Sequence, residues 1–233
     1  MKPLPEVIVQ KLGLIDYKEA WDIQEQYFKS AIDRKIARRN DDSLPLPHNY
    51  LLFCEHPNVF TIGKSGNEDH LLLSQKELVS NDTSYYKINR GGDITYHGPG
   101  QLVVYPILDL EQFFTDIHKY MRLLEQVVIN TLSHFKIDSG RIEGMTGVWV
   151  DYSKNKPRKI CAMGVKSSRW VTMHGIGFNI NTDLSFFSHI VPCGINDKAV
   201  TSLQKELGVE VDLSVIEKRV LQEFQTLFDF DIK

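Results

Sequence analysis

Short apolar runs typical of β-strands follow one another along this chain, and many have no helical pattern between them. They lie at residues 50–53, 59–62, 85–88 and 102–108 in the first half, and at 147–150, 160–165 and 174–180 in the second. Parallel neighbours need long crossover connections, whereas antiparallel neighbours are joined by short turns. The spacing therefore favours antiparallel or mixed pairing over a doubly wound parallel sheet.

Other segments carry the apolar periodicity of helices that pack on such sheets. The first begins at Asp16, which has the spacing of a capping box with Glu19, and its apolar face is Trp21, Phe28, Ile32 and Ile36. The second covers residues 116–135, and the third begins at Ser214, three residues before Glu217. We predict an α/β fold of the α+β type, with mixed β-sheets flanked by helices.

The composition narrows the class of protein. With 233 residues, 42% hydrophobic and 24% charged, we expect a single domain over residues 1–233, or that domain with a smaller C-terminal lobe from about residue 184. The net charge of −3 gives no global attraction to nucleic acid or to an anionic membrane. No apolar run approaches the roughly 20 residues of a membrane span, and the first residues lack the apolar stretch of a signal peptide. We therefore expect a cytoplasmic protein, and a monomer because no apolar stripe is left over.

A glycine-rich stretch at residues 90–101 reads Arg-Gly-Gly-Asp-Ile-Thr-Tyr-His-Gly-Pro-Gly-Gln. Four glycines and a proline indicate tight backbone and the close approach of another group to the main chain, which Arg90, Tyr96 and His97 would line. A pair of hairpin turns that need glycine at positive φ explains the composition equally well. The stretch is neither a Walker loop nor a Gly-x-Gly-x-x-Gly motif, so phosphate binding by either device is unsupported.

The three cysteines differ in context. Cys54 and Cys161 lie in apolar runs typical of core thiols, whereas Cys193 stands between a proline and a glycine in a non-periodic segment. Cys193 is therefore a candidate nucleophile, with a half-buried, inert thiol as the alternative. A partner that favours the thiolate is needed, and spacing leaves open whether it is His97, His174, His189 or a lysine such as Lys159. The scattered histidines and isolated cysteines match no metal site.

Taken together, these motifs resemble those of the lipoyl(octanoyl) transferases. The resemblance rests on residues 90–101, on Lys-Ile-Cys-Ala-Met-Gly at 159–164, on His-Gly-Ile-Gly-Phe-Asn at 174–179, on Pro-Cys-Gly at 192–194 and on the segment 56–63. It implies the fold of biotin and lipoate protein ligases, and the transfer of an octanoyl group from octanoyl-acyl carrier protein to a lysine of a lipoyl domain. The acceptors it implies are the E2 subunits of 2-oxoacid dehydrogenases and the glycine cleavage H protein, and it implies no cofactor.

The resemblance also implies residue roles. Cys193 matches the nucleophile that carries the acyl group as a thioester, and Lys159 matches the residue that lowers the pKa of that cysteine and serves as general acid and base. The positions that match the substrate-binding segments are Arg90, Gly91, Gly92, Asp93, Ile94, Thr95, Tyr96, His97, Ala162, Met163, Gly164, Gly175, Ile176 and Gly177. Asp93 departs from the more usual glutamine, and Gly177 from a common alanine. We expect the small residues to leave room for the eight-carbon chain, and Gly177 to widen the pocket slightly.

The sequence alone leaves other functions open. An ATP-dependent lipoate or biotin ligase shares the fold and needs no nucleophilic cysteine, whereas an amidotransferase that moves octanoate between lipoyl domains also uses one. A non-catalytic binder of carrier or lipoyl domains is a further alternative. Basic patches at residues 34–39 and 154–159 are hypothetical docking sites for acidic carrier domains, although cations at 34–39 also complement a helix C-terminus.

Overall fold

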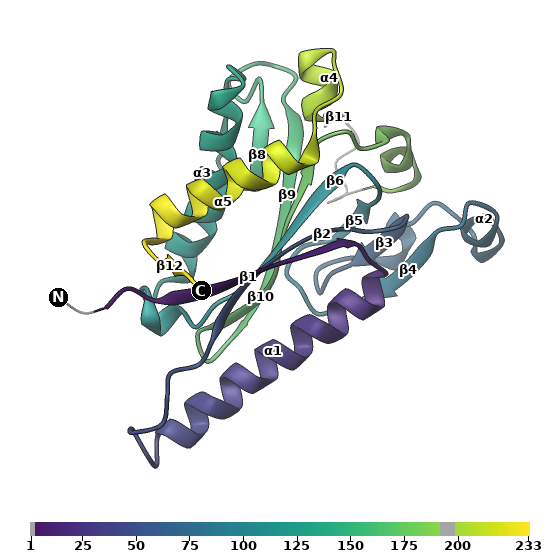
Figure 1. The fold of residues 1–233 in the computed structure, drawn as a ribbon. Helices are drawn as coiled ribbons and strands as arrows, with labels where there is room; N and C mark the ends of the chain where they lie inside the picture. Colours follow the sequence, from purple (N-terminus) through teal and green to yellow (C-terminus); the bar gives the residue numbers. More distant parts are fainter. Residues whose placement is uncertain (1–2, 192–198) are drawn as a thin grey trace.

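The computed structural model describes residues 3–191 and 199–233, and its centre is a large mixed β-sheet (Figure 1). The strand order is β12-β1-β2-β6-β10-β9-β8-β7, and β11 pairs with β9. Pairing is antiparallel from β2 through β6, β10, β9 and β8 to β7, and parallel between β1 and β2, β1 and β12, and β9 and β11. The bounds are β1 (Glu6–Leu14), β2 (Asn49–Glu55), β6 (Gln101–Ile107), β7 (Ser139–Ile142), β8 (Met145–Val150), β9 (Arg158–Ser168), β10 (Val171–Asn179), β11 (Ala199–Val200) and β12 (Asp231–Ile232). The predicted mixed pairing is confirmed.

A smaller sheet stands beside the large one and has the order β4-β3-β5. It comprises β3 (Val59–Ile62), β4 (Ser84–Lys87) and β5 (Ile94–His97), with β3 parallel to β4 and antiparallel to β5. The bounds of β3 are those predicted. Strand β5 lies inside the glycine-rich stretch, so the hairpin-turn interpretation of that stretch was incomplete: glycines flank a strand there.

Helices cover both faces of the large sheet (Figure 1). On one face α1 (Tyr17–Arg38) packs, and on the other α3 (Ile117–His134) and α5 (Leu213–Phe228) pack together. The shorter helices are α2 (Gln75–Ser80), α4 (Leu203–Leu207) and the 3-10 turns η1 (Glu68–His70), η2 (Leu110–Gln112) and η3 (Leu184–His189). The layers match the prediction of sheets flanked by helices.

Strand β2 shows how the sequence builds these two faces. Leu51 and Phe53 belong to the core beneath α3 and α5, whereas Leu52 and Cys54 belong to the core beneath α1. Successive side chains of a strand point to opposite faces, so a strand buried on both sides needs a continuous apolar run. The run at residues 50–53 is therefore explained by burial on two faces.

The predicted helix starts hold in two cases of three. Asp16 caps α1 by accepting hydrogen bonds from the N–H groups of Lys18 (2.7 Å) and Glu19 (3.3 Å), and Asp116 caps α3. The third prediction was wrong by two residues, because α5 is capped by Asp212, whose carboxylate accepts from the N–H of Ser214.

The predicted apolar face of α1 was largely right: Phe28 is buried, and Trp21 and Ile32 are partly buried against the same core. The buried residues include Ala20, Gln24, Phe28 and Ala31, while Ile36 is 41% exposed. The apolar face was predicted from large aromatic and branched side chains only. The prediction missed Ala20 and Ala31, small residues that allow the helix to approach the sheet closely.

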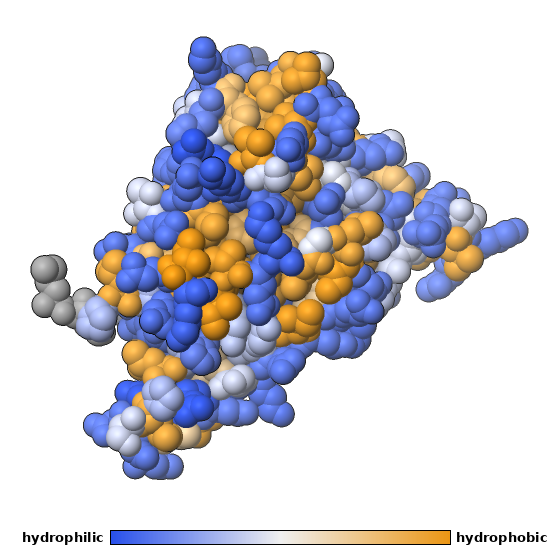
Figure 2. All heavy atoms as spheres, viewed as in Figure 1, coloured by the Kyte–Doolittle hydropathy of each residue, from blue (hydrophilic) through white to orange (hydrophobic). Residues whose placement is uncertain are grey.

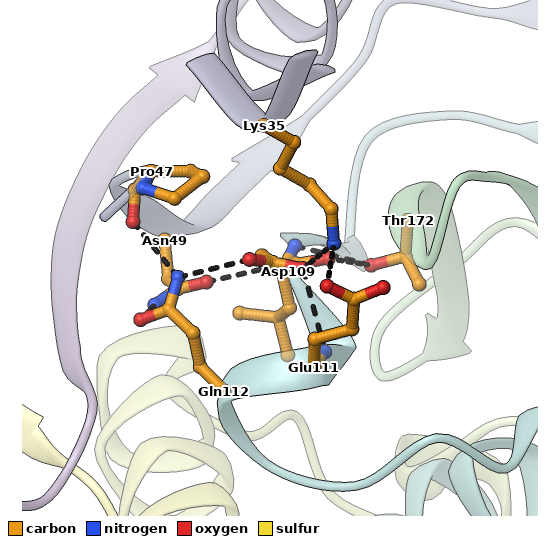
Figure 3. Close-up of polar contacts among 8 residues, drawn as sticks. Lys35, Pro47, Asn49, Asp109, Glu111, Gln112 and Thr172 are labelled. Carbon is orange, nitrogen blue, oxygen red and sulfur yellow. Dashed lines mark hydrogen bonds and ion pairs between the residues drawn. The ribbon is translucent and has the colours of Figure 1, made fainter. Parts of the chain in front are cut away.

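Lys35, near the basic end of α1, is anchored to the sheet (Figure 3), whereas Arg34 and Arg39 are exposed. Lys35 forms ion pairs with the buried Asp109 and with Glu111. The N–H of Asp109 donates to Asn49 Oδ1 (2.8 Å), which ties the same carboxylate residue to the start of β2. Arg38 and Arg39 line a cleft of about 850 Å³ beside this network.

None of the described helices combines the length and apolar character that crossing a membrane requires. On the face seen in Figure 1, apolar groups are interspersed with hydrophilic ones (Figure 2).

Candidate active site

A cavity of about 430 Å³ opens where the two sheets meet the N-terminal end of α1. Its walls come from the 90–92 loop, β5, β9 and β10, with Tyr17 of α1, Met121 of α3, Trp149 of β8 and Val200 of β11. Among the predicted site residues that the structure describes, all except Tyr96 lie on this wall. The structure thus brings together segments that are far apart in the sequence, while their chemical roles stay predictions.

The paired strands β9 and β10 bring two of the sequence motifs side by side. In their antiparallel register Gly164 lies opposite Gly175, Met163 opposite Ile176 and Ala162 opposite Gly177. The segments at 162–164 and 175–177 therefore form one continuous patch of pocket wall.

The glycines of this wall serve close packing, which corrects our expectation that they leave room for an acyl chain. A methyl group on Gly164 would lie 2.7 Å from Gly91 O, and one on Gly175 would lie 2.3 Å from Val104 O. On Gly177 it would lie 3.0 Å from Gln101 Oε1, so neighbouring atoms fill the space that a side chain would take. The glycines contribute backbone to the pocket wall, and the cavity lies beyond them.

Arg90 holds the glycine-rich loop against the small sheet. Its guanidinium, which is buried, donates to Thr61 O (2.7 Å), Thr61 Oγ1 (3.0 Å) and Gly91 O (3.0 Å). Gly91 N–H donates to Val165 O (2.9 Å), so the same loop is bonded to β9. Gly92 has a φ of +87°, a conformation that favours glycine. Both interpretations of the stretch were therefore partly right: a turn glycine and close backbone approach occur together.

Lys159 stands at the start of β9, on the pocket wall. Its Nζ lies 4.7 Å from the centre of the Trp149 ring, a distance at which an ammonium is attracted to an aromatic face. Lys159 passes over Gly147 of β8, where an added methyl group would be in ordinary van der Waals contact with Lys159 Cε (3.5 Å) but would clash with Cys161 O (2.6 Å). Val200 of β11 lies opposite Lys159 in parallel register.

Residues 192–198 fall outside the described chain, so Cys193 and its neighbours Pro192 and Gly194 are not placed. The described chain on either side ends close to the cavity. Val191 is bonded through its N–H to His70 O (2.9 Å), and Val200 lines the cavity itself. The nucleophile role of Cys193 stays a prediction.

Two of the candidate histidine partners are buried and neutral. Burial, together with His56, lowers the pKa of His97 to about 3, and burial with Arg90 lowers the pKa of His174 to about 3. Gln101 uses its amide nitrogen for Tyr96 O and Asn179 Oδ1, so its Oε1 accepts from His97 Nδ1 (2.6 Å). A neutral imidazole with so low a pKa is a weak base and supplies no positive charge to a thiolate. These environments favour Lys159 over His97 and His174.

Tyr96 and Asp93 need separate mention among the predicted binding residues. Tyr96 is fully buried, stacks on Phe186 with ring centres 4.8 Å apart, and donates its hydroxyl proton to Asn58 Oδ1 (2.8 Å). Its ring packs between the small sheet and η3. Asp93 lies on the cavity wall and pairs with His70, with Oδ2 and Nδ1 2.6 Å apart.

The two described cysteines are core residues, as expected from their apolar context. Cys54 and Cys161 are both buried and free. Burial raises the pKa of each thiol well above its ordinary value. Both thiols are therefore protonated at neutral pH and poor nucleophiles.

Sequence reasoning missed Trp149 and Tyr17 as parts of the cavity. Trp149 lies two residues after Gly147 in a predicted strand, so both face the same side, and that spacing was available from the sequence. Tyr17 follows a helix cap, and only tertiary structure shows that its ring stacks on His97, with centres 6.0 Å apart.

We expect the aromatic face of Trp149 to matter more than its volume. In Trp149→Leu turnover should fall about tenfold, because loss of a partly buried cation–π contact costs about 1–2 kcal/mol. Trp149→Phe keeps a π face at nearly the volume of leucine and should lose clearly less. Trp170→Leu changes a tryptophan outside the cavity and is the control. Equal rates for the phenylalanine and leucine variants would show that Lys159 does not depend on the ring.

The fold defines the class of protein. It is shared with a bi-partite lipoate protein ligase from Thermoplasma acidophilum (TM-score 0.68, 17% identity, covering 98% of this chain and 86% of that one). It is also shared with a biotin protein ligase from Aquifex aeolicus in complex with biotin and ATP (TM-score 0.51, 14% identity, covering 98% and 71%). The predicted biotin and lipoate protein ligase fold is confirmed.

The chain belongs to the lipoyl protein ligase A/B catalytic domain family, whose model matches residues 16–225. It is 55% identical to an octanoyltransferase from Cytophaga hutchinsonii, over 97% of this chain and 94% of that protein. Within the family it therefore groups with the octanoyltransferases, and it is an acyltransferase.

Proposed function

We propose that this acyltransferase takes an octanoyl group from octanoyl-acyl carrier protein onto Cys193 as a thioester and passes it to a lysine of a lipoyl domain. The observation that carries the proposal is the position of Lys159. It stands on the wall of a largely apolar cavity, beside an aromatic face and opposite Val200, where the described chain resumes after residues 192–198. The similarity to octanoyltransferases over nearly the whole chain supports the octanoyl group as cargo.

The cavity suits an acyl chain bound to a small polar head. Its size falls in the range of about 300–1,000 Å³ that is usual for small-molecule sites. Apolar side chains on its wall include Met121, Met163, Ile176 and Phe187. Burial of each methylene of an octanoyl chain against such a wall contributes about 0.8 kcal/mol.

The first chemical step exchanges one thioester for another. Lys159 accepts the proton of the Cys193 thiol, the thiolate attacks the acyl carbonyl carbon, and the bond to the carrier's phosphopantetheine sulfur breaks. Lys159 then returns the proton to the departing thiolate. Because one thioester forms as another breaks, this step is close to isoenergetic.

The second step transfers the acyl group to nitrogen. The amine of the acceptor lysine attacks the acyl-enzyme, the carbon–sulfur bond to Cys193 breaks and an amide forms. The neutral Lys159 accepts a proton from the attacking amine and passes it to the departing Cys193 thiolate, which returns the enzyme to its starting state. An amide is more stable than a thioester, so this step drives the reaction forward.

The choice of donor separates this reaction from that of a ligase on the same fold. We expect octanoyl-acyl carrier protein alone to octanoylate an apo lipoyl domain, with no ATP in the reaction, because the thioester is already activated. Free octanoate with ATP should give neither octanoylated domain nor pyrophosphate. Pyrophosphate release that depends on octanoate would instead indicate an ATP-dependent ligase. An octanoylated lipoyl domain used as the only donor tests the amidotransferase alternative.

The two basic patches contribute little to this proposal. Tyr17 lines the cavity and Lys35 lies 18 residues further along α1, which at about 1.5 Å per residue places them roughly 27 Å apart. A carrier docked at residues 34–39 would therefore sit at the opposite end of the helix from the cavity. In the other patch, Arg158 pairs with Asp151 (2.6 Å) and Glu206 (2.9 Å), so carboxylates offset its charge.

A further inference from the structure

Asp93 joins the cavity wall to a neighbouring loop. Its Oδ1 accepts from the N–H of Ile94 (2.7 Å), which fixes the carboxylate at the start of β5. Its Oδ2 lies 2.6 Å from His70 Nδ1, and the Asp93 side chain is only 7% exposed. Nδ1 donates to the carboxylate whether the imidazole is neutral or protonated, so the contact is a strong hydrogen bond in either state.

The backbone around His70 in turn holds the segment that precedes residue 192. His70 O accepts from the N–H of Val191 (2.9 Å), and the N–H of Leu72 donates to His189 O (2.9 Å). Leu71 and Ile190 form an isolated antiparallel bridge between these two bonds. Three consecutive residues on each side are therefore paired, and this short ladder ends two residues before Cys193.

We propose that Asp93 and His70 form a positioning pair, which ties the cavity wall to residues 189–191 and so sets the place from which the chain continues to Cys193. The inference rests on the proposed role of Cys193 and assigns to Asp93 a function other than contact with the acyl group.

Geometry explains why such a pair is needed. The ladder of residues 70–72 and 189–191 is short, and an isolated two-stranded pairing is marginally stable in water. The carboxylate of Asp93 adds a charge-assisted bond at the end of the ladder that is nearest to Cys193. Misplacement of a reacting group by about 1 Å lowers rates by up to about 100-fold, so a small displacement of this ladder has a large effect on transfer.

The test compares His70→Ala with His70→Asn. The amide nitrogen of asparagine stands close to the position of His Nδ1, so it can donate to Asp93, whereas alanine cannot. We expect His70→Ala to acylate about tenfold more slowly, with the KM for octanoyl-acyl carrier protein changed less than about twofold. His70→Asn should recover most of the rate. Hydrogen exchange at the Val191 amide should be about tenfold faster in His70→Ala and near native in His70→Asn.

Lys87→Met is the matched control. Lys87 pairs with Glu68 (2.9 Å) in the same 3-10 turn as His70, but both side chains are largely exposed and neither residue lines the cavity. This variant should change neither the rate nor the exchange at Val191. Thermal melting is compared for all variants. If His70→Ala unfolds, Asp93→Asn replaces it; this variant keeps the shape but not the charge, and its exchange rate should exceed the native one.

Two results would overturn the positioning role. One is equal acylation rates for His70→Ala and His70→Asn, and the other is unchanged exchange at Val191 when the contact to Asp93 is lost. If the native enzyme forms no adduct on Cys193, the proposed function fails. The exchange measurement still decides whether the pair holds residues 189–191.

Discussion

Incubation with octanoyl-acyl carrier protein should attach one octanoyl group to Cys193 and none to Cys54 or Cys161. Burial leaves the latter two thiols protonated, and both lie in the core of the large sheet. Intact-mass spectrometry should show one adduct per chain, and peptide mapping should place it on residue 193. Neutral hydroxylamine should release it, because a thioester is cleaved under conditions that leave an amide intact.

Cys193→Ser should abolish the adduct and lower turnover by about 10³-fold or more, since removal of a nucleophile eliminates the covalent route. Cys54→Ala is the control, because Cys54 is a buried thiol in the core beneath α1 and does not line the cavity. That variant should acylate at the native rate once folded. An adduct on Cys54 or Cys161, or full activity in Cys193→Ser, would contradict the proposed mechanism.

The sequence predicted well those elements that have a simple apolar pattern, either an uninterrupted apolar run or an apolar helical stripe. Strand β3 and helix α3 were predicted almost to the residue, because β3 is an uninterrupted apolar run and α3 has both a cap and a complete apolar stripe. Strand β1 was missed because its apolar run at residues 7–9 is short and is followed by the polar Gln10 and Lys11. Strand β5 was missed because glycines surround four residues that only the partner strand β3 makes recognisable.

The site was predicted as a set of segments, but not as a geometry. The order of the motifs assigned Arg90, Lys159 and Gly175 to one predicted site, and the structure places all three on the wall of one cavity. The reason given for the glycines was wrong: a methyl group added to Gly175 would lie 2.3 Å from Val104 O, and this crowding arises only because β6 lies beside β10. The low pKa of His97 likewise depends on burial that no local pattern shows.

Lys159→Ala should slow acylation of Cys193 by about 10²–10⁴-fold at neutral pH, the range usual for loss of a general acid or base. The lysine accepts the thiol proton in the proposed first step. Among the described residues of the cavity wall, His97 and His174 replace it poorly, because burial leaves both neutral, with pKa values of about 3. Rapid-quench measurement of the acyl-enzyme separates this step from transfer to the lipoyl domain. Lys166→Ala is the matched control, because Lys166 lies on the same strand but pairs with Glu25 (3.0 Å) outside the cavity.

The pH dependence of Lys159→Ala distinguishes two roles for the lysine. Without a proton acceptor, the thiol must lose its proton to solvent, and the thiolate fraction then rises about tenfold per pH unit up to the ordinary cysteine pKa of about 8.5. If Lys159 serves to form the thiolate, the variant should regain rate as pH rises from 6 to about 8.5, and the gap to the native enzyme should narrow. If the gap stays constant over this range, thiolate formation is not what the lysine supplies. Its contribution then lies in returning the proton to the leaving thiol or in holding the substrate, and slow transfer from a preformed acyl-enzyme to the lipoyl domain would locate it in the second step.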